Sequence, residues 1–307
     1  MIIIKDTTEF NIDAESAVTI GKFDGIHRGH RELIDRILEK KKDGLQSVVF
    51  TFDKSPLEFF SGKTVPGLTT VEEKRRIFEF LGIDVLVEFP LNKETAATDP
   101  ERFIDDILIS KLNMKYIAAG TDITFGYKGL GNAELIKEKA TGHYDYDIVD
   151  KLILDGDEVS SSLIREIVAI GDMEKASKLI GVPYAIKGKI TRGNQIGRTI
   201  GFPTINIEVS RDKLMPPFGV YYTEISIEGK HYNGITNVGT KPTVTDDETV
   251  FAETNILDFN EDVYDKSATV KLLHFARPER KFDSLDELKS QISNDIEGGV
   301  TFFTLHK

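Results

Sequence analysis

The chain has 307 residues, with 39 Lys and Arg against 51 Asp and Glu, a formal net charge of −12 and no cysteine. This length predicts two domains, and the acidic balance argues against a large nucleic-acid surface. The lack of cysteine excludes disulfides and thiol catalysis, and it suits a reducing compartment. No apolar run approaches the ~20 residues of a membrane span, and the first residues are too short for the apolar region of a signal peptide. We therefore expect a cytoplasmic protein that binds neither membranes nor nucleic acid, although small anionic ligands remain compatible with its charge.

Short apolar runs alternate with amphipathic helices through the first half of the chain. Strands are predicted at 17–20, 47–52, 84–89, 116–119 and 146–149. Helices are predicted at 31–42, after the capping-box pattern from Thr70 to Glu73, from Asp99 and Pro100 onward, and at 133–140. This alternation predicts a doubly wound parallel sheet of the Rossmann-like class, whose ligands bind beyond the carboxyl ends of the strands.

The pattern changes near Gly181. Beyond it, strand-like runs separated by glycine turns span 186–190, 204–209, 219–227, 231–238, 250–257 and 268–275. A clear helical period returns at 284–296. The second half therefore reads as a small antiparallel β-barrel with a closing helix. We place the two domains at 1–181 and 182–307.

The turn 21–30 reads Gly-Lys-Phe-Asp-Gly-Ile-His-Arg-Gly-His and lies where the first predicted strand passes into a helix. The first amide groups of a helix lack intrahelical partners and its dipole favours an anion, so this is a phosphate-binding position. Glycines permit a close backbone approach, and histidines three apart share a helical face. The alternative is an ordinary turn with two surface histidines. The candidate residues are His27 and His30, with Gly21, Phe23, Asp24, Gly25 and Gly29.

A run of three serines, Ser160, Ser161 and Ser162, opens another helix. Serine is a preferred helix cap, so one capping residue with two spare neighbours is the simple interpretation. The functional interpretation is that the hydroxyls and amides of this turn hold a phosphate while Arg165, one turn inside, supplies a fixed positive charge.

The long form of the histidine turn resembles the nucleotidyltransferases of the His-x-Gly-His type. More specifically, it is similar to the bacterial bifunctional riboflavin kinase/FAD synthetase family. The serine turn resembles that family's Ser-Ser-Thr-x-Ile-Arg motif, with Ser162 in the threonine's place. The loop 120–126 resembles a family loop in which Ile123 replaces an aromatic residue, and the resemblance implies that Asp122 and Phe125 contact the flavin.

One segment departs from the family pattern. The run 52–56 reads Phe-Asp-Lys-Ser-Pro where the family usually has Phe-Asp-Pro-His-Pro. A histidine that orients phosphates there is replaced by Ser55, so no catalytic role passes to Ser55 and adenylyl transfer is expected to be slower.

The stretch 188–206 is rich in glycine and resembles the riboflavin kinase signature. A mobile hairpin loop is the alternative, because a glycine-rich loop alone is a weak signal. The P-loop pattern does not occur in the chain. Thr204 and Asn206 are two apart, so they share one face of a strand and offer the oxygen ligands that Mg²⁺ accepts. The resemblance assigns nucleotide phosphates to Gly188, Gly193, Arg198 and Gly201.

The remaining assignments rest on the resemblance. Glu253 occupies the position of the glutamate that accepts the proton of the ribityl hydroxyl, whereas Asn255 stands where a histidine is often found. Arg277, in an Arg-Pro-Glu run, is assigned to the flavin. Without the resemblance, a single carboxylate such as Glu253 would not be identified as a functional residue.

The resemblance implies two ATP-dependent reactions with Mg²⁺. The barrel would convert riboflavin to FMN, and the first domain would convert FMN to FAD and pyrophosphate. One alternative is a kinase whose first domain binds nucleotide without adenylylating FMN. Another is a flavin-responsive regulator without catalysis, which would be expected to lack Glu253 or the Thr204 and Asn206 pair. The sequence does not predict the oligomeric state.

Overall fold

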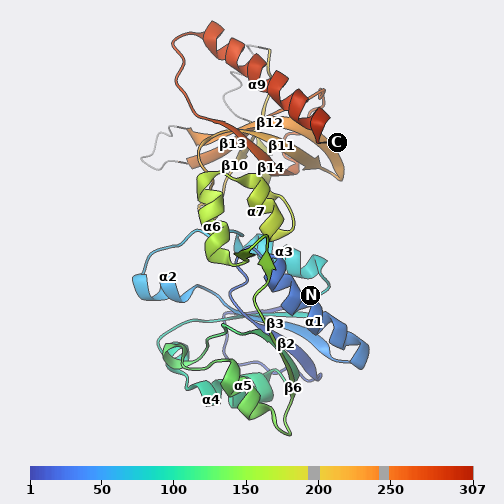
Figure 1. The fold of residues 1–307 in the computed structure, drawn as a ribbon, viewed down its shortest axis with the longest axis vertical. Helices are drawn as coiled ribbons and strands as arrows, with labels where there is room; N and C mark the ends of the chain where they lie inside the picture. Colours follow the sequence, from blue (N-terminus) through green and yellow to red (C-terminus); the bar gives the residue numbers. More distant parts are fainter. Residues whose placement is uncertain (193–200, 242–248, 307) are drawn as a thin grey trace. The chain divides into compact units, whose positions relative to one another are not determined.

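The computed structural model describes residues 1–192, 201–241 and 249–306 (Figure 1). It divides into two compact units, residues 1–161 and residues 162–307. Within the described ranges, no helix is long and apolar enough to cross a membrane.

In the first unit, six of the described strands form the predicted parallel sheet, in the order β1-β4-β3-β2-β5-β6. β1 was not predicted from the sequence. It is a four-residue edge strand that pairs only with β4, and its Ile2 side chain is exposed, so it lacks the buried apolar pattern of a central strand. The strands are β1 (Ile2–Lys5), β2 (Ser16–Ile20), β3 (Gln46–Phe52), β4 (Val85–Phe89), β5 (Met114–Gly120) and β6 (Asp145–Val149), with a small hairpin of β7 (Ile153–Leu154) and β8 (Asp157–Glu158).

Helices cover both faces of this sheet, as the doubly wound class requires. On one face, α1 and α3 bury apolar side chains such as Ile34 and Phe78 against Val49 and Leu86. The other face carries η3 and α5 over a second core cluster. The elements are α1 (Arg28–Glu39), η1 (Lys40–Asp43), α2 (Pro56–Ser61), α3 (Val71–Phe80), η2 (Thr95–Ala97), α4 (Pro100–Arg102), η3 (Phe103–Lys111), η4 (Tyr127–Gly129) and α5 (Ala133–Ala140).

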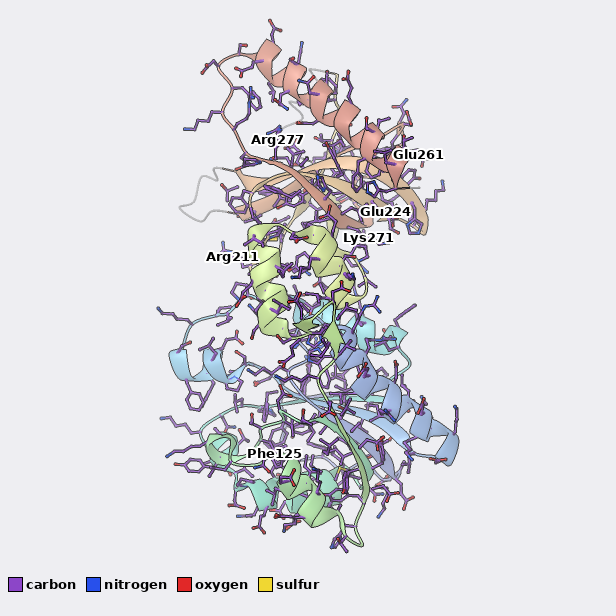
Figure 2. The ribbon with its side chains drawn as sticks, in the orientation of Figure 1. Phe125, Arg211, Glu224, Glu261, Lys271 and Arg277 are labelled. Carbon is purple, nitrogen blue, oxygen red and sulfur yellow. The ribbon has the colours of Figure 1, made fainter. Side chains whose placement is uncertain are left out.

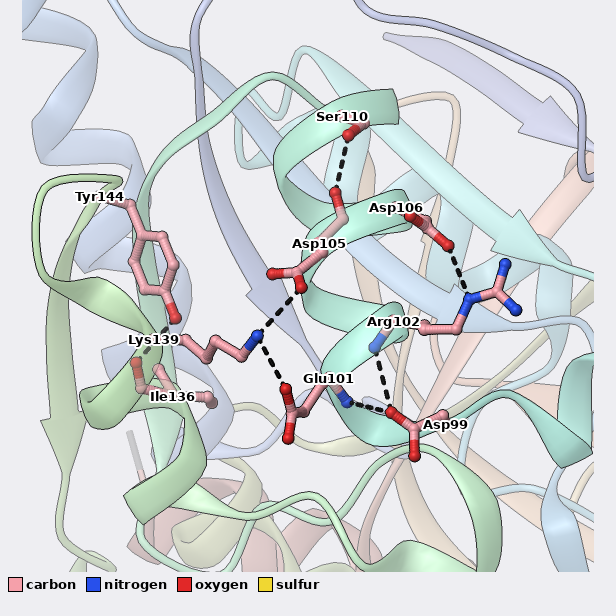
Figure 3. Close-up of polar contacts among 9 residues, drawn as sticks. All are labelled: Asp99, Glu101, Arg102, Asp105, Asp106, Ser110, Ile136, Lys139 and Tyr144. Carbon is pink, nitrogen blue, oxygen red and sulfur yellow. Dashed lines mark hydrogen bonds and ion pairs between the residues drawn. The ribbon is translucent and has the colours of Figure 1, made fainter.

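The helix predicted after Asp99 begins there, because the Asp99 side chain accepts the amide hydrogens of the first turn. After one turn it continues as the π-helix η3, which the apolar spacing alone does not distinguish from an α-helix. Lys139 of α5 lies 3.0 Å from both the Glu101 and the Asp105 carboxylates and so ties these helices together (Figure 3).

α2 was also not predicted, although the sequence carries its start signal. The Ser55 hydroxyl accepts the amide hydrogen of Glu58, and the Glu58 carboxylate accepts that of Ser55, which forms a complete capping box before Pro56. The residue that replaces the family's histidine therefore has a local structural role.

The second unit contains the predicted barrel. Six of its described strands close in the order β10-β13-β12-β11-β14-β9 with antiparallel pairing. Its interior includes a chain of buried hydroxyls, in which Thr236 lies 2.8 Å from both Thr223 and Thr254. The elements are α6 (Ser161–Ile170), α7 (Met173–Ile180), β9 (Tyr184–Thr191), β10 (Ile205–Glu208), β11 (Gly219–Ile227), β12 (Lys230–Lys241), β13 (Thr249–Ile256), β14 (Ser267–Pro278) and α9 (Leu285–Leu305).

α7 packs against β9 and β14 of the barrel, which is why the second unit begins before the boundary at 181/182 that the sequence predicts. The Glu174 carboxylate lies 2.5 Å from Nδ1 of His274 on β14, and Gly171 lies against Phe275. The position of the functional domain boundary remains a prediction.

Candidate functional site

The histidine turn connects β2 to α1 through an unusual backbone. Phe23, Gly25 and Ile26 have φ angles of 49°, 81° and 40°, in the left-handed region that non-glycine residues seldom adopt. The Phe23 ring is fully buried and lies 5.7 Å from the Phe78 ring of α3. Phe23 therefore anchors the turn in the core, and its side chain is not available to a nucleotide.

Packing explains part of the glycine pattern. A Cβ on Gly21 would lie 3.2 Å from the Phe23 ring, and one on Gly25 would lie 3.0 Å from Leu68. At Gly29 the nearest contact would be 3.4 Å from the His27 ring. The turn itself therefore favours glycine at Gly21 and Gly25, whereas the contact at Gly29 is an ordinary one. The contacts of all three with phosphate remain predictions.

His27 and His30 do share one face, as predicted. Their rings stack with centroids 3.6 Å apart, and the Phe23 ring lies 5.1 Å from His30. His27 is the N-cap of α1, and its Nδ1 accepts the amide hydrogen of His30 at 3.4 Å. Among the described residues, the buried Nδ1 of His30 has no hydrogen-bond partner.

Burial keeps both imidazoles neutral at physiological pH. It lowers the pKa of His27 to about 4, although the charges of Asp24 and Asp122 act in the opposite direction. Burial, followed by the neighbouring charges of His27 and Lys74, holds the pKa of His30 well below its ordinary value. Because Nδ1 of His27 is an acceptor, its proton lies on Nε2. His27 can therefore donate a hydrogen bond to a phosphate oxygen but contributes no full positive charge.

These pKa values predict how stability depends on pH. Between pH 6.5, the ordinary pKa, and about pH 4, the unfolded chain binds a proton at His27 that the folded chain does not, so the free energy of unfolding falls as the pH falls. The free energy of unfolding is unaffected by the titration of His27 above pH 6.5, and it has fallen by about 3 kcal/mol at pH 4.

His27→Asn keeps a capping side chain but cannot titrate. Denaturant unfolding should show wild type losing about 3 kcal/mol more than His27→Asn from pH 7 to 4, and equal losses would contradict the assignment.

Asp24, within the histidine turn, contacts Leu68 and Ser161. The Asp24 carboxylate accepts the amide hydrogen of Leu68 at 2.7 Å, and its backbone carbonyl accepts the hydroxyl of Ser161 at 2.9 Å. Asp24 thus helps to hold the turn in place, and the phosphate contact predicted for it remains a prediction. Ser161 comes to the turn as predicted. Arg165 and Ser162 belong to the second unit, so their convergence on the histidines, like the role of Ser160, remains a prediction.

The two predicted flavin contacts of the first domain differ in exposure. Asp122 is exposed, lies 3.3 Å from Lys151, and is close enough to His27 to raise its pKa. Phe125, labelled in Figure 2, is 3% exposed and packs 5.4 Å from the Phe103 ring. Its backbone pairs with Gly131, which directs the ring into the core. The Phe125 ring therefore offers no open face to a flavin in this structure.

In the second unit, a cavity of about 640 Å³ lies against the barrel. Side chains of β13, the end of β14, the segment after it and α9 form its walls. Glu253, Thr204 and Arg277 all line this cavity, so the barrel brings together residues that the sequence separates widely. Its volume lies within the range of small-molecule sites.

The Thr204 hydroxyl donates a hydrogen bond to Oε1 of Glu253 at 2.8 Å. Asn206 pairs in register with Glu253 across β10 and β13 and is almost fully buried. Among the described residues, no group of three or more His, Asp and Glu side chains could hold a metal. A hydroxyl, an amide and a carboxylate nevertheless suit Mg²⁺, which takes few protein ligands when nucleotide phosphates and water supply the rest.

A second polar group, formed by Arg277, Asp295 and Gln291, lies at the wall of the same cavity. Arg277, labelled in Figure 2, donates two hydrogen bonds to Asp295 of α9, at 2.9 and 2.7 Å, and Gln291 donates a third at 2.8 Å. Asp295 and Gln291 were not predicted as site residues. Leu288, Ile292 and Ile296 of α9 also line the cavity, although their helical spacing in the sequence reads as ordinary core packing.

Only part of the glycine-rich stretch 188–206 lies within the residues that the structure describes. A Cβ on Gly188 would lie 2.5 Å from Ile207, so the lack of a side chain at Gly188 lets the neighbouring strand pack closely. Gly201 has a left-handed φ of 93°. Gly193 and Arg198 lie outside the described residues, and their phosphate contacts remain predictions. Asn255, in place of the family's histidine, donates a hydrogen bond to the Pro203 carbonyl at 2.8 Å.

Comparison with known proteins places both halves in known families. The FAD synthetase family model matches residues 9–163, and the riboflavin kinase model matches residues 180–303. The bifunctional riboflavin kinase/FMN adenylyltransferase of Listeria monocytogenes is 35% identical over 97% of this chain and 95% of its own length. The protein of the same name from Bacillus subtilis is 36% identical over 95% and 93%.

A solved structure covers nearly the whole chain as well. A Streptococcus pneumoniae protein described as a macrolide-efflux protein has a TM-score of 0.85 and 32% identity, and it covers 96% of this chain and 97% of its own. Both family models match, and relatives above 30% identity match over nearly the full length. The chain therefore belongs to the bifunctional riboflavin kinase/FMN adenylyltransferase family.

Proposed function

We propose that this chain makes FAD from riboflavin in two steps that each consume ATP. The barrel phosphorylates riboflavin to FMN and releases ADP, and the first domain transfers an adenylyl group to FMN and releases pyrophosphate. The observation that carries the first step is the hydrogen bond between Thr204 and Glu253 in the wall of an apolar cavity. The second step rests on the stacked histidines at the end of β2, of which His27 is buried.

In the kinase step, Glu253 accepts the proton of the terminal ribityl hydroxyl. The hydroxyl oxygen bonds to the γ-phosphorus of ATP while the bond from that phosphorus to the bridging oxygen breaks. The Thr204 hydroxyl orients the Glu253 carboxylate. The apolar side chains of α9 provide a wall for the flavin ring, and Arg277, held by Asp295, provides a polar group at its edge.

Mg²⁺ bound with ATP would neutralise charge on the phosphates. Thr204 and Asn206 would hold it, because they present oxygen atoms beside Glu253.

In the adenylylation step, a phosphate oxygen of FMN attacks the α-phosphorus of ATP, and the bond to pyrophosphate breaks. This nucleophile is already an anion, so no general base is needed. His27 and His30 place the ATP phosphates by donating hydrogen bonds as neutral imidazoles. The serine turn and Arg165 are proposed to complete the phosphate site.

A kinase with a nucleotide-binding but inactive first domain is the second candidate. The observation that favours it is the role of Ser55, which caps α2 and offers no imidazole to the phosphates. A cytoplasmic location, the absence of nucleic-acid and membrane partners, and domains at 1–181 and 182–307 are part of the same proposal.

ATP labelled with radioactive phosphorus tests both steps together. Label in the γ position should appear in FMN and then in FAD, because FAD retains the phosphate of FMN. Label in the α position should appear in FAD alone. If FMN becomes labelled from the γ position while FAD receives no α label, the inactive first domain is the correct account. If neither flavin is labelled, the chain is not this enzyme.

A further inference from the structure

Lys74 lies next to the histidine turn, and no motif in the sequence indicates a role for it. It is half-buried in the first turn of α3, whose start is fixed by the capping box of Thr70 and Glu73. The ammonium of Lys74 lies 3.5 Å from the carbonyl oxygen of Lys22, within the turn. α3 and α1 pack on the same face of the sheet (Figure 1).

Two hydrogen bonds, each from a backbone amide to a side chain, hold the segment before α3 against the turn. The amide of Leu68 donates to the Asp24 carboxylate at 2.7 Å, and the amide of Gly25 donates to the Thr69 hydroxyl at 3.2 Å. The start of α3, which carries Lys74, is therefore tied directly to the turn.

Three carboxylates surround Lys74 without pairing with it. Burial lowers the pKa of Lys74, whereas the charges of Asp24, Glu88 and Glu58 raise it. Yet no carboxylate in the described part of the chain lies within ion-pair distance, 4.0 Å, of its ammonium. Each of the three carboxylates has other partners.

Those partners are amides and one guanidinium. Asp24 accepts from Leu68, and Glu58 accepts the amide hydrogens of Ser55 and Val65 at 2.9 and 3.3 Å. Glu88 accepts two hydrogen bonds from Arg75, at 2.9 and 2.5 Å. An ammonium carries three donors, and a half-buried one that uses a single long contact is poorly satisfied. This arrangement fits a site that an anion completes.

The chemistry of the first domain would gain from such a cation in addition to the proposed Arg165. Adenylyl transfer brings the phosphate of FMN to the triphosphate of ATP, and the two anions repel each other. His27 and His30 are neutral and therefore supply donors without full charge. A fixed positive charge beside them would lower this repulsion and stabilise the charge that develops on the leaving pyrophosphate.

We propose that Lys74 is a further catalytic residue of FMN adenylylation, whose ammonium binds a phosphate of ATP or of FMN above the histidine turn. This inference rests on the proposed function of the first domain. A purely structural role is the competing explanation, in which Lys74 holds α2, α3 and the turn together by balancing the charges of their carboxylates.

The two explanations predict different effects of a Lys74 substitution on stability as well as on activity. Lys74→Met keeps the length of the side chain and removes its charge. If Lys74 serves a ligand, the melting temperature of the free protein should stay the same or rise, because a half-buried charge with few partners is removed. If Lys74 is structural, the melting temperature should fall, and activity should recover at lower temperature.

The kinetic test compares Lys74→Met, Lys74→Arg and the control Arg76→Met, an exposed position on the same helix. With FMN supplied, Lys74→Met should lower kcat/KM for FAD formation by roughly two to three orders of magnitude, the usual cost of one charge-stabilising group. Lys74→Arg should recover part of the loss, and Arg76→Met should behave as wild type. Riboflavin phosphorylation should be unchanged in all three variants. A rise in KM for ATP alone assigns the ammonium to ATP, and a rise for FMN alone assigns it to FMN.

Calorimetric titration keeps this inference separate from the proposed function. Pyrophosphate and FMN are titrated into wild type and Lys74→Met, and at least one should bind more than tenfold more weakly to the variant. If wild type forms no FAD, the proposed adenylylation fails, whereas a loss of anion affinity would still support Lys74 as a phosphate ligand. Wild-type rates and wild-type affinities for both anions in Lys74→Met would overturn the inference. A lowered melting temperature with parallel losses in both reactions would also overturn it.

Discussion

Glu253→Gln is expected to lower riboflavin phosphorylation by about two to four orders of magnitude, the range for loss of a general base. The amide keeps the volume of the side chain and still offers an oxygen to the Thr204 hydroxyl, which lies 2.8 Å from the carboxylate. It cannot accept the proton of the ribityl hydroxyl. The rate of FMN formation from riboflavin and ATP, measured by separating the flavins, gives the effect.

The second activity of the same chain serves as the internal control. FMN supplied directly should be converted to FAD by Glu253→Gln at the wild-type rate, since His27 and His30 are unaffected. Glu208→Gln is a matched control, because Glu208 is an exposed glutamate on the adjacent strand β10. FMN formation at the wild-type rate in Glu253→Gln would show that another group accepts the proton.

His30→Ala is expected to impair the other of the two reactions. It should lower FMN adenylylation by about two to three orders of magnitude, because one preorganised donor to the transition state is lost. Riboflavin phosphorylation should stay near the wild-type rate. FAD formation from supplied FMN measures the first effect, and FMN formation from riboflavin measures the second.

The packing of His30 calls for a second variant. Its ring lies between those of His27 and Phe23, so alanine also leaves a space in the turn. His30→Gln fills much of that space and can donate a hydrogen bond, and it should be less impaired than His30→Ala. His143→Ala, an exposed histidine of the same unit, is the control. Unchanged adenylylation in His30→Ala would remove this histidine from the site.

The sequence predicted the fold well wherever hydrophobic spacing was regular. The central strands of the sheet are buried on both faces and were all found, but β1 at its edge was not, because an exposed Ile2 breaks the expected pattern. The start signal of α2 was present at Ser55 and was interpreted only as a departure from the family pattern. The π-helical geometry of η3 leaves no distinct spacing in the sequence.

The sequence predicted some contacts between site residues better than others, depending on how far apart the residues lie in the chain. His27 and His30 are three apart, so local geometry alone brings their rings together. Glu253 and Thr204 are 49 residues apart and meet only when the barrel closes, so the sequence offered the pair through family resemblance alone. Phe125 turns into the core because its backbone pairs with Gly131, which a loop motif does not reveal.

Lys74 illustrates a residue that no motif indicates. In the sequence it is one of several charges that follow a helix start, and its half-buried position over the turn depends on the contacts of Asp24 and Thr69 with neighbouring backbone. Asp295 is similar, because its pairing with Arg277 requires α9 to return to the end of β14.

A time course of the flavins tests the central claim most directly. Purified protein is incubated with riboflavin, ATP and Mg²⁺, and riboflavin, FMN and FAD are separated at intervals. We predict that FMN appears first and that FAD then forms at its expense in the same vessel. If FMN accumulates and no FAD forms with ATP in excess, the first domain does not adenylylate, and if no FMN forms at all, the account of the barrel is wrong.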